Sequence, residues 1–369
     1  MSEPVKSVLH DAQEAVGATF REEDGWLWTE SIGSDLAGYE AVRDGMAIWD
    51  IYPLIKWEIT GPDAGAAIQR VYTADLSRQG IGKVKYGAFV DDAGLLVDDG
   101  TVYKHAEDRY WVLTNAEDTG EHLMENARGL QFTLVNRTLE MPLISAQGPR
   151  SREILQGMTE ADLSRLRYYN FLTERVQVAG VTTWLARTGF SGELGFELIP
   201  DPDGAPKLWA ALNDAGGVPF GLTVLEPVRV EAGLIVYGSD YDPGEDTPYD
   251  VSMDRYVSLD SDVDFLGRQV LGQIAAAPPR RLVTLRISGD ELPEMGAPVF
   301  AEGSSDGVAI GTVTSPADSP RMGLLALAKI DTPASAIGTT VRVEVGGTTA
   351  EATVAELSIK DPEKLRPRV

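Results

Sequence analysis

The sequence contains no cysteine and only three histidines among its 369 residues. The absence of thiols excludes disulfides, iron–sulfur clusters, cysteine-ligated zinc and thiolate nucleophiles. The three histidines, His10, His105 and His122, lack the spacing that is typical of metal ligands, and no Gly-x-Ser-x-Gly motif accompanies them. We therefore expect no metal site, and we set aside zinc enzymes and serine hydrolases.

Basic residues and long apolar runs are also scarce. The chain has 57 acidic against 32 basic residues, a formal net charge of −25, which disfavours nucleic acid and anionic membranes as partners. No apolar run approaches the roughly 18 residues that a membrane-spanning helix needs. Residues 1–8 lack the basic and apolar regions of a signal peptide. We expect a cytoplasmic protein that binds neither nucleic acid nor membrane.

The length and the hydrophobic patterning predict two or three domains with mixed secondary structure. Residues 36–48 carry a helical pattern, and residues 54–60 resemble a strand that leads into a helix start at Gly61-Pro62. A linker rich in alanine and proline occupies residues 275–281, and beyond it short strands alternate with glycine-rich turns. The pattern predicts an α+β region followed by an antiparallel barrel or sandwich.

Asp98 and Asp99 stand together in an otherwise apolar run, residues 94–100. If the run is a strand, alternation places the two carboxylates on opposite faces, so that at most one faces a shared cavity. A carboxylate at the edge of an apolar cavity can orient an amine or accept its proton. However, Asp-Asp-Gly is also a common turn sequence, and on local residues alone the turn is the better interpretation.

Three glycines and Glu193 occur in residues 189–195, with the spacing Gly-x-x-Gly-x-x-Gly. This spacing differs from the dinucleotide-binding fingerprint, and the sequence has no Gly-Lys-Ser/Thr phosphate loop, so we expect no nicotinamide or flavin. The glycines would let the backbone approach a flat group while the glutamate accepts hydrogen bonds. A tight turn with a solvated glutamate explains the same residues equally well.

Residues 187–197, Arg-Thr-Gly-Phe-Ser-Gly-Glu-Leu-Gly-Phe-Glu, resemble the signature of folate-dependent aminomethyltransferases, the T-protein of glycine cleavage and its relatives. Other segments resemble the family in the same order: residues 41–50, residues 85–99, Gln147-Gly148-Pro149 and residues 229–238. The resemblance covers nearly the whole chain. It implies tetrahydrofolate as the cofactor and three domains around a central folate cavity, the last being an antiparallel β-barrel.

The domain boundaries implied are residues 1–50 with 141–277 for a folate-binding α+β domain, 51–140 for a second α+β domain, and 278–369 for the barrel. Asp98 matches the catalytic aspartate of the family, and Glu193 matches the glutamate that binds the pterin edge. The other residues assigned to cofactor binding are Tyr86, Asn115, Gly189, Phe190 and Arg229. Residues assigned to substrate contact are Trp26, Trp57, Tyr168 and Tyr237. Trp26, Trp28 and Trp57 could form an aromatic cage for an onium methyl group, but packing in the core is the better interpretation of these three indoles.

Two features favour the tetrahydrofolate-dependent demethylase branch of the family, which includes dimethylsulfoniopropionate demethylase and aromatic O-demethylases. Leu225 stands where the T-protein carries an arginine associated with folate binding, and residues 237–240 resemble the demethylases. We therefore expect one-carbon transfer from a small O-, S- or N-methylated substrate to N5 of tetrahydrofolate. The alternatives are an aminomethyltransferase that uses a lipoyl carrier protein and a non-catalytic folate-binding relative.

Overall fold

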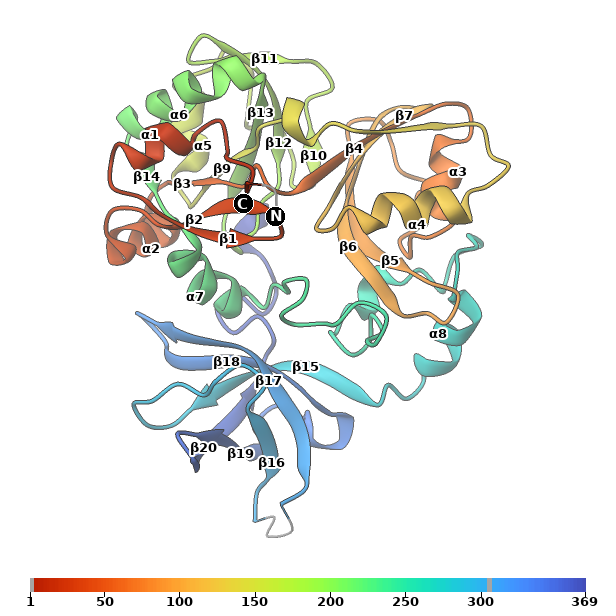
Figure 1. Ribbon diagram of the computed structural model, residues 1–369, viewed down its shortest axis with the longest axis vertical. Coiled ribbons are helices and arrows are strands. Elements are labelled where there is room, and N and C mark those ends of the chain that lie inside the picture. Colours follow the sequence, from red (N-terminus) through yellow and green to blue (C-terminus); the bar gives the residue numbers. More distant parts are fainter. Residues whose placement is uncertain (1–2, 304–306) are drawn as a thin grey trace.

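The computed structural model describes residues 3–303 and 307–369 of the chain. Two sheets with their helices and a closed antiparallel barrel occupy three separate parts of the molecule (Figure 1), which confirms the predicted fold class. No helix within the described ranges is both long enough and apolar enough to cross a membrane.

The first sheet has seven strands, and six of them follow the order β10-β12-β13-β9-β3-β14, while the seventh, β11, pairs with β12. The strands are β3 (Ala47–Asp50), β9 (Ile144–Gln147), β10 (Asn170–Phe171), β11 (Val176–Val178), β12 (Val181–Arg187), β13 (Gly195–Pro200) and β14 (Val218–Pro219). The helices in this part of the chain are α1 (His10–Glu14), α2 (Asp35–Asp44), α5 (Ser151–Gln156), α6 (Ala205–Asp214) and α7 (Leu222–Ala232). A separate hairpin is formed by β1 (Thr19–Glu23) and β2 (Trp26–Ser31).

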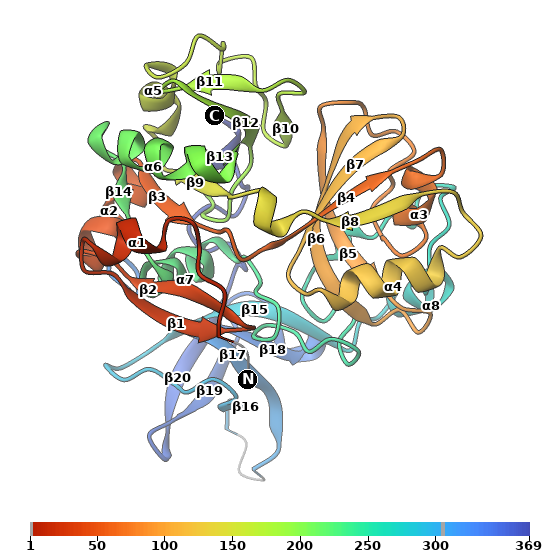
Figure 2. The ribbon, with the colours of Figure 1, turned by 45° about the horizontal axis from the view of Figure 1, so that its top comes forward.

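The second sheet is antiparallel and has the order β5-β6-β7-β4-β8. Its strands are β4 (Ile55–Thr60), β5 (Val84–Val90), β6 (Leu96–Ala106), β7 (Arg109–Thr114) and β8 (Thr133–Asn136). Two helices of the same part of the chain, α3 (Ala64–Gln69) and α4 (Asp118–Asn126), lie beside the sheet in both ribbon views (Figure 2). Asp98 and Asp99 lie inside β6 rather than in a turn, so the turn interpretation of these residues is wrong.

The barrel closes because β15 pairs with both β18 and β20. Its strands are β15 (Arg280–Ile287), β16 (Pro298–Ala301), β17 (Ala309–Ser319), β18 (Gly323–Asp331), β19 (Thr340–Val345) and β20 (Thr348–Ala355). Helix α8 (Arg268–Ile274) precedes it and lies near the second sheet. The inward-facing side chains form an aliphatic core in which Leu285, Val299 and Val341 are fully buried.

Helix α7 joins the first sheet region to the barrel. It contacts α2 and β2 on one side and strands β17 and β18 on the other (Figure 1). The helix ends where Gly233 adopts a left-handed conformation, with φ of 60°, and a Cβ at this position would collide with the carbonyl of Leu357. Glycine is therefore required where the helix end meets the C-terminal segment.

Residues 36–48 do not form the single helix that their pattern predicts. Helix α2 begins after Ser34, whose hydroxyl accepts a hydrogen bond from Ala37 N, and it ends at Asp44. Residues 47–50 form β3, which is buried throughout and hydrogen-bonds to β9 and β14 in the first sheet. A run of four residues is too short for local periodicity to separate a strand from a helix.

Candidate functional site

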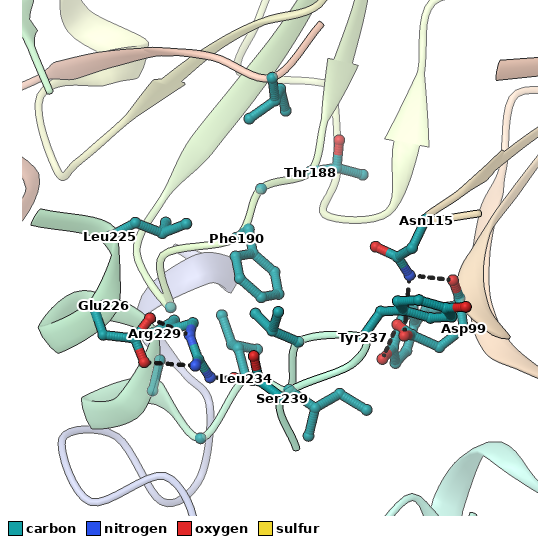
Figure 3. A pocket seen from close by; sticks show the side chains of 18 of the residues that line it. Asp99, Asn115, Thr188, Phe190, Leu225, Glu226, Arg229, Leu234, Tyr237 and Ser239 are labelled. Carbon is teal, nitrogen blue, oxygen red and sulfur yellow. Dashed lines mark hydrogen bonds and ion pairs between the residues drawn. The ribbon is translucent and has the colours of Figure 1, made fainter. Parts of the chain in front are cut away.

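A cavity of about 1300 Å³ lies where the hairpin, the two sheets and the C-terminal segment meet. Its lining includes residues of β1 and β2, of β5 and β6, of the β12–β13 loop, of α7 and of the segment 356–368. Figure 3 shows this interior, with Asn115 and Asp99 on one side and Glu226 and Arg229 of α7 on the other. Residues that are distant in sequence therefore line one space.

Asp99 is the carboxylate of β6 that lines the cavity. Tyr241 Oη donates to its Oδ1 at 2.6 Å, and Tyr86 Oη donates to its Oδ2 at 2.7 Å. Asn115 Nδ2 donates to Oδ1 at 3.2 Å, as drawn in Figure 3. Burial raises the pKa of Asp99, while the hydrogen bonds from Tyr241, Tyr86 and Asn115 act in the opposite direction. The arrangement presents an oriented hydrogen-bond acceptor to the cavity.

Asp98 was the predicted catalytic residue, but its side chain does not line the cavity. It is fully buried and points to the start of α4, where its Oδ2 accepts hydrogen bonds from Ala116 N at 3.0 Å and Thr119 Oγ1 at 2.6 Å. Burial, followed by the charge of Asp99, raises the pKa of Asp98 to about 7. Strand alternation explains the difference, because adjacent residues of β6 face opposite sides of the sheet.

Four residues assigned to cofactor binding on sequence line the cavity: Tyr86, Asn115, Gly189 and Phe190. Gly189 opens the loop between β12 and β13, where a Cβ would collide with the side chain of Gln147. The Phe190 ring projects from the same loop into the view of Figure 3. Their roles in binding stay predictions, but the structure brings them to one cavity.

Glu193 and Arg229 also line the cavity, but protein partners occupy their charged groups. Glu193 forms ion pairs with Arg43 at 2.9 Å and with Arg366 at 2.6 Å, and 1% of its side chain is exposed. Arg229 is paired with Glu226 at 2.6 Å and with Asp240 at 2.8 Å. The charged groups of Glu193 and Arg229 therefore form ion pairs within the protein, and few of their hydrogen-bonding positions remain for a ligand.

Glu197 is a cavity carboxylate that the sequence reasoning missed. It lies on β13 and accepts hydrogen bonds from the hydroxyls of Tyr103, at 3.1 Å, and Thr188. Burial raises its pKa, and these hydroxyls and the charge of Lys56 act in the opposite direction. The signature at residues 187–197 contains two glutamates, and the resemblance assigns only the first, Glu193, to the ligand.

Among the aromatic residues predicted to contact the substrate, Tyr168 and Tyr237 line the cavity, whereas Trp26 and Trp57 do not. The Trp26 ring packs edge-on against Tyr52, with ring centroids 5.3 Å apart. Trp57 Nε1 donates to Thr114 Oγ1 at 3.1 Å, so this indole belongs to the interior of the second sheet region. The indoles that do line the cavity are Trp28 and Trp49.

Two family models match nearly the whole chain. One, described as the GCVT N-terminal domain, matches residues 9–261, and the other, described as the glycine cleavage T-protein C-terminal barrel domain, matches residues 280–361. The aminomethyltransferase of Saccharopolyspora erythraea is 35% identical over 366 residues, which covers 97% of this chain and 98% of the relative. The aminomethyltransferase of Streptomyces avermitilis is 36% identical over 357 residues, covering 93% and 94%.

The same architecture occurs in a solved structure, that of the glycine cleavage system aminomethyltransferase T from Bartonella henselae. The TM-score is 0.87 at 23% sequence identity, and the match covers 96% of this chain and 98% of the other. At this identity the likeness supports the fold alone. The family models and the two relatives, however, extend over both sheets and the barrel, and on that basis the chain belongs to the glycine cleavage T-protein family.

Proposed function

We propose that the protein is an aminomethyltransferase, which moves a one-carbon unit from an aminomethyl donor to tetrahydrofolate in the central cavity. The observation that carries this choice is the likeness of at least 35% identity, over nearly the full chain, to two proteins named aminomethyltransferase. In the mechanism that we propose, the donor is presented by a lipoyl carrier protein and ammonia is released. This proposal takes the place of the sequence-based expectation that the donor is a methylated small molecule.

The cavity is compatible with tetrahydrofolate, the cofactor of this family. Its volume of about 1300 Å³ is above the ~300–1000 Å³ that is usual for small-ligand sites, as an extended ligand requires. Phe190 and Tyr168 offer ring faces for stacking a flat pterin. Glu197 offers a buried carboxylate to the N–H groups of an amino-pyrimidine edge. We therefore assign the pterin edge to Glu197 in place of Glu193.

Tetrahydrofolate supplies the nitrogen that accepts the carbon unit. Asp99 would accept a hydrogen bond from an amine in the cavity and hold it in a reactive orientation. Tyr86 and Tyr241 limit the freedom of that carboxylate, because each hydroxyl binds a different oxygen. Favourable orientation of two reactants is worth roughly 7–11 kcal/mol, so alignment is the main contribution that we assign to these side chains.

A second candidate function is tetrahydrofolate-dependent demethylation of an O-, S- or N-methylated small molecule. One observation favours it: the buried side chain of Leu225 lines the cavity at the position where the resemblance leads one to expect an arginine. An apolar wall there, with Trp28, Trp49 and Phe190 also lining the cavity, suits a methylated donor. Aromatic faces also attract onium groups, which are one class of methyl donor.

The folate product distinguishes the two functions. We would supply tetrahydrofolate with either an aminomethylated lipoyl carrier protein or a panel of methylated donors, and measure 5,10-methylene- and 5-methyltetrahydrofolate. The aminomethyl reading predicts the methylene product, release of ammonia and dependence on the carrier. The methyl product, formed without a carrier, would support demethylation.

Asp99→Asn tests the role of the cavity carboxylate in either reaction. The amide keeps the size of the side chain but lacks its charge, so we expect kcat to fall about 100- to 1000-fold, the effect typical of losing one preorganised electrostatic contact. Asp108→Asn is the matched control, because Asp108 is exposed in the turn between β6 and β7. Wild-type turnover by Asp99→Asn would contradict the proposal.

A further inference from the structure

Asp98 is held by a dense set of donors although its side chain is fully buried and does not line the cavity. Its Oδ1 accepts from Asp99 N and from Asn115 Nδ2, both at 2.7 Å. Its Oδ2 accepts from Asn115 N at 3.0 Å in addition to Ala116 N and Thr119 Oγ1. Five hydrogen bonds exceed the roughly four lone-pair positions of a carboxylate, so the group is saturated.

Four of these five hydrogen bonds come from residues 115–119, where the chain leads from β7 into α4, and the fifth comes from Asp99 N in β6 itself. The first N–H groups of a helix lack partners within the helix, and a side chain usually caps them. Here the residue before α4, Glu117, makes no capping hydrogen bond with its side chain. Asp98, on a neighbouring strand, binds the N–H groups of Asn115 and Ala116, which precede the helix, and the hydroxyl of Thr119 in its first turn. It thereby fixes the segment against the sheet.

Asn115 links Asp98 to the cavity. Its side chain lines the cavity, and Nδ2 donates both to Asp98 Oδ1, at 2.7 Å, and to Asp99, at 3.1 Å to the carbonyl oxygen and 3.2 Å to Oδ1. The shortest of these three contacts is the one to Asp98. Loss of the Asp98 acceptor would free the amide to rotate. Asp99 Oδ1 would then lose one of its two donors and keep only Tyr241 Oη.

We propose that Asp98 is a positioning residue, which orients the cavity carboxylate of Asp99 through the side-chain amide of Asn115. The proposal rests on the proposed function, because it assumes that Asp99 acts in one-carbon transfer. It gives Asp98 a role that requires no contact with substrate or cofactor. It also explains why two adjacent carboxylates are buried on opposite faces of β6, since one orients the other through a third side chain.

The test compares Asp98→Asn with Thr119→Val. Asp98→Asn keeps the shape of the side chain but replaces one acceptor oxygen by an amide NH2, which is itself a donor and so disturbs the hydrogen bonds of Asn115. Thr119→Val removes one hydrogen bond to the same carboxylate and leaves the bonds of Asn115 intact, so it controls for a purely structural effect. The readouts are kcat, KM for tetrahydrofolate, and tetrahydrofolate binding followed by tryptophan fluorescence.

We expect kcat of Asp98→Asn to fall about 10- to 100-fold, because a small misplacement of a reacting group has effects of this size. KM and the binding constant for tetrahydrofolate should stay within about twofold of wild type. Thr119→Val should lower the urea midpoint of unfolding and leave kcat of the folded protein unchanged. Equal losses of kcat in the two variants would reduce Asp98 to a structural role and overturn the proposal.

Asn115 provides the second arm of the test. Asn115→Ala removes the link itself, so the double variant with Asp98→Asn should have the kcat of Asn115→Ala alone. Multiplication of the two single effects would mean that Asp98 acts independently of Asn115, which contradicts the proposal. Unchanged kcat in Asn115→Ala contradicts it too, even if Asp98→Asn does not fold. Failure of the proposed function is a separate outcome, seen as wild-type turnover in Asp99→Asn.

Discussion

The region around Arg43 and the region around Asp98 and Asp99 are both buried, yet their carboxylates are stabilised by different means. Arg43 forms ion pairs with Glu193 at 2.9 Å and with Glu231 at 2.6 Å, and Arg366 adds a second cation to Glu193. We call these four residues the Arg43 cluster. The hydrogen bonds to Asp98 and Asp99 come from neutral hydroxyl and amide groups instead.

The difference between ion pairs and neutral hydrogen-bond donors indicates a different role for each region. Opposite charges at close range make the Arg43 cluster a link between α2, the β12–β13 loop, α7 and the C-terminal segment. Neutral donors orient the carboxylates of Asp98 and Asp99 but leave their negative charge uncompensated, so burial raises both pKa values. The first region is suited to holding the molecule together, and the second to proton and amine chemistry.

Breaking the Arg43 cluster should have the largest effect on stability. Arg43→Met keeps the volume but leaves Glu193 and Glu231 buried with one cation fewer, so we expect the free energy of unfolding to fall by about 3–5 kcal/mol. Urea denaturation measures it. The control is Arg128→Met, which removes an exposed pair with Glu125 and should change stability by about 0–1 kcal/mol. A similar small change in Arg43→Met would refute the linking role.

Variants of Glu197 and Glu193 should differ in which quantity changes most, the affinity for tetrahydrofolate or the free energy of unfolding. Glu197→Gln replaces one acceptor oxygen by a donor, so we expect tetrahydrofolate affinity to fall about tenfold or more, because a hydrogen bond to a charged group contributes roughly 1.5–3 kcal/mol. Glu193→Gln should chiefly lower the free energy of unfolding, since that carboxylate belongs to the Arg43 cluster. Titration calorimetry and urea denaturation of both variants measure the contrast, and the reverse pattern would restore Glu193 as the ligand residue.

The smallest effect should be a pH dependence specific to Asp98. Its pKa in the folded chain is about 7, above the ordinary value of 3.8, so the folded state binds more protons than the unfolded state between these values. Stability from this group is therefore present at low pH and is lost as pH rises towards 7. In urea titrations from pH 5 to 8, Asp98→Asn should have a smaller decrease in stability with rising pH than wild type. Parallel curves would mean that Asp98 does not titrate there.

Much of the fold could be predicted from local patterns. The strand at residues 54–60, the strands within 86–113 and the all-β region after residue 280 correspond to β4, to β5–β7 and to the barrel. The short strand β3 could not be predicted, because four residues are too few for local periodicity to separate a strand from a helix. Its conformation depends on pairing with β9 and β14, which lie about 100 and 170 residues further along the chain.

The candidate site was predicted less completely, for a related reason. The family motifs assign Tyr86, Asn115 and Phe190 to cofactor binding, and all three line the cavity. A motif does not specify, however, which groups its charged side chains contact. Glu193 is bound by Arg43 and Arg366, residues 150 positions before and 173 positions after it. Such partners cannot be read from the signature at residues 187–197 itself.

The sequence by itself determined the family, an α+β region followed by a β-barrel, the absence of thiol chemistry and the rule that only one of Asp98 and Asp99 can face a cavity. That rule is local, because side chains alternate along any strand. Only the tertiary structure decided that the cavity residue is Asp99, that Glu197 and not Glu193 has a carboxylate free of ion pairs, and that Trp28 lines the cavity while Trp26 does not. Those choices depend on which face of each strand packs against distant parts of the chain, and periodicity carries no information about that.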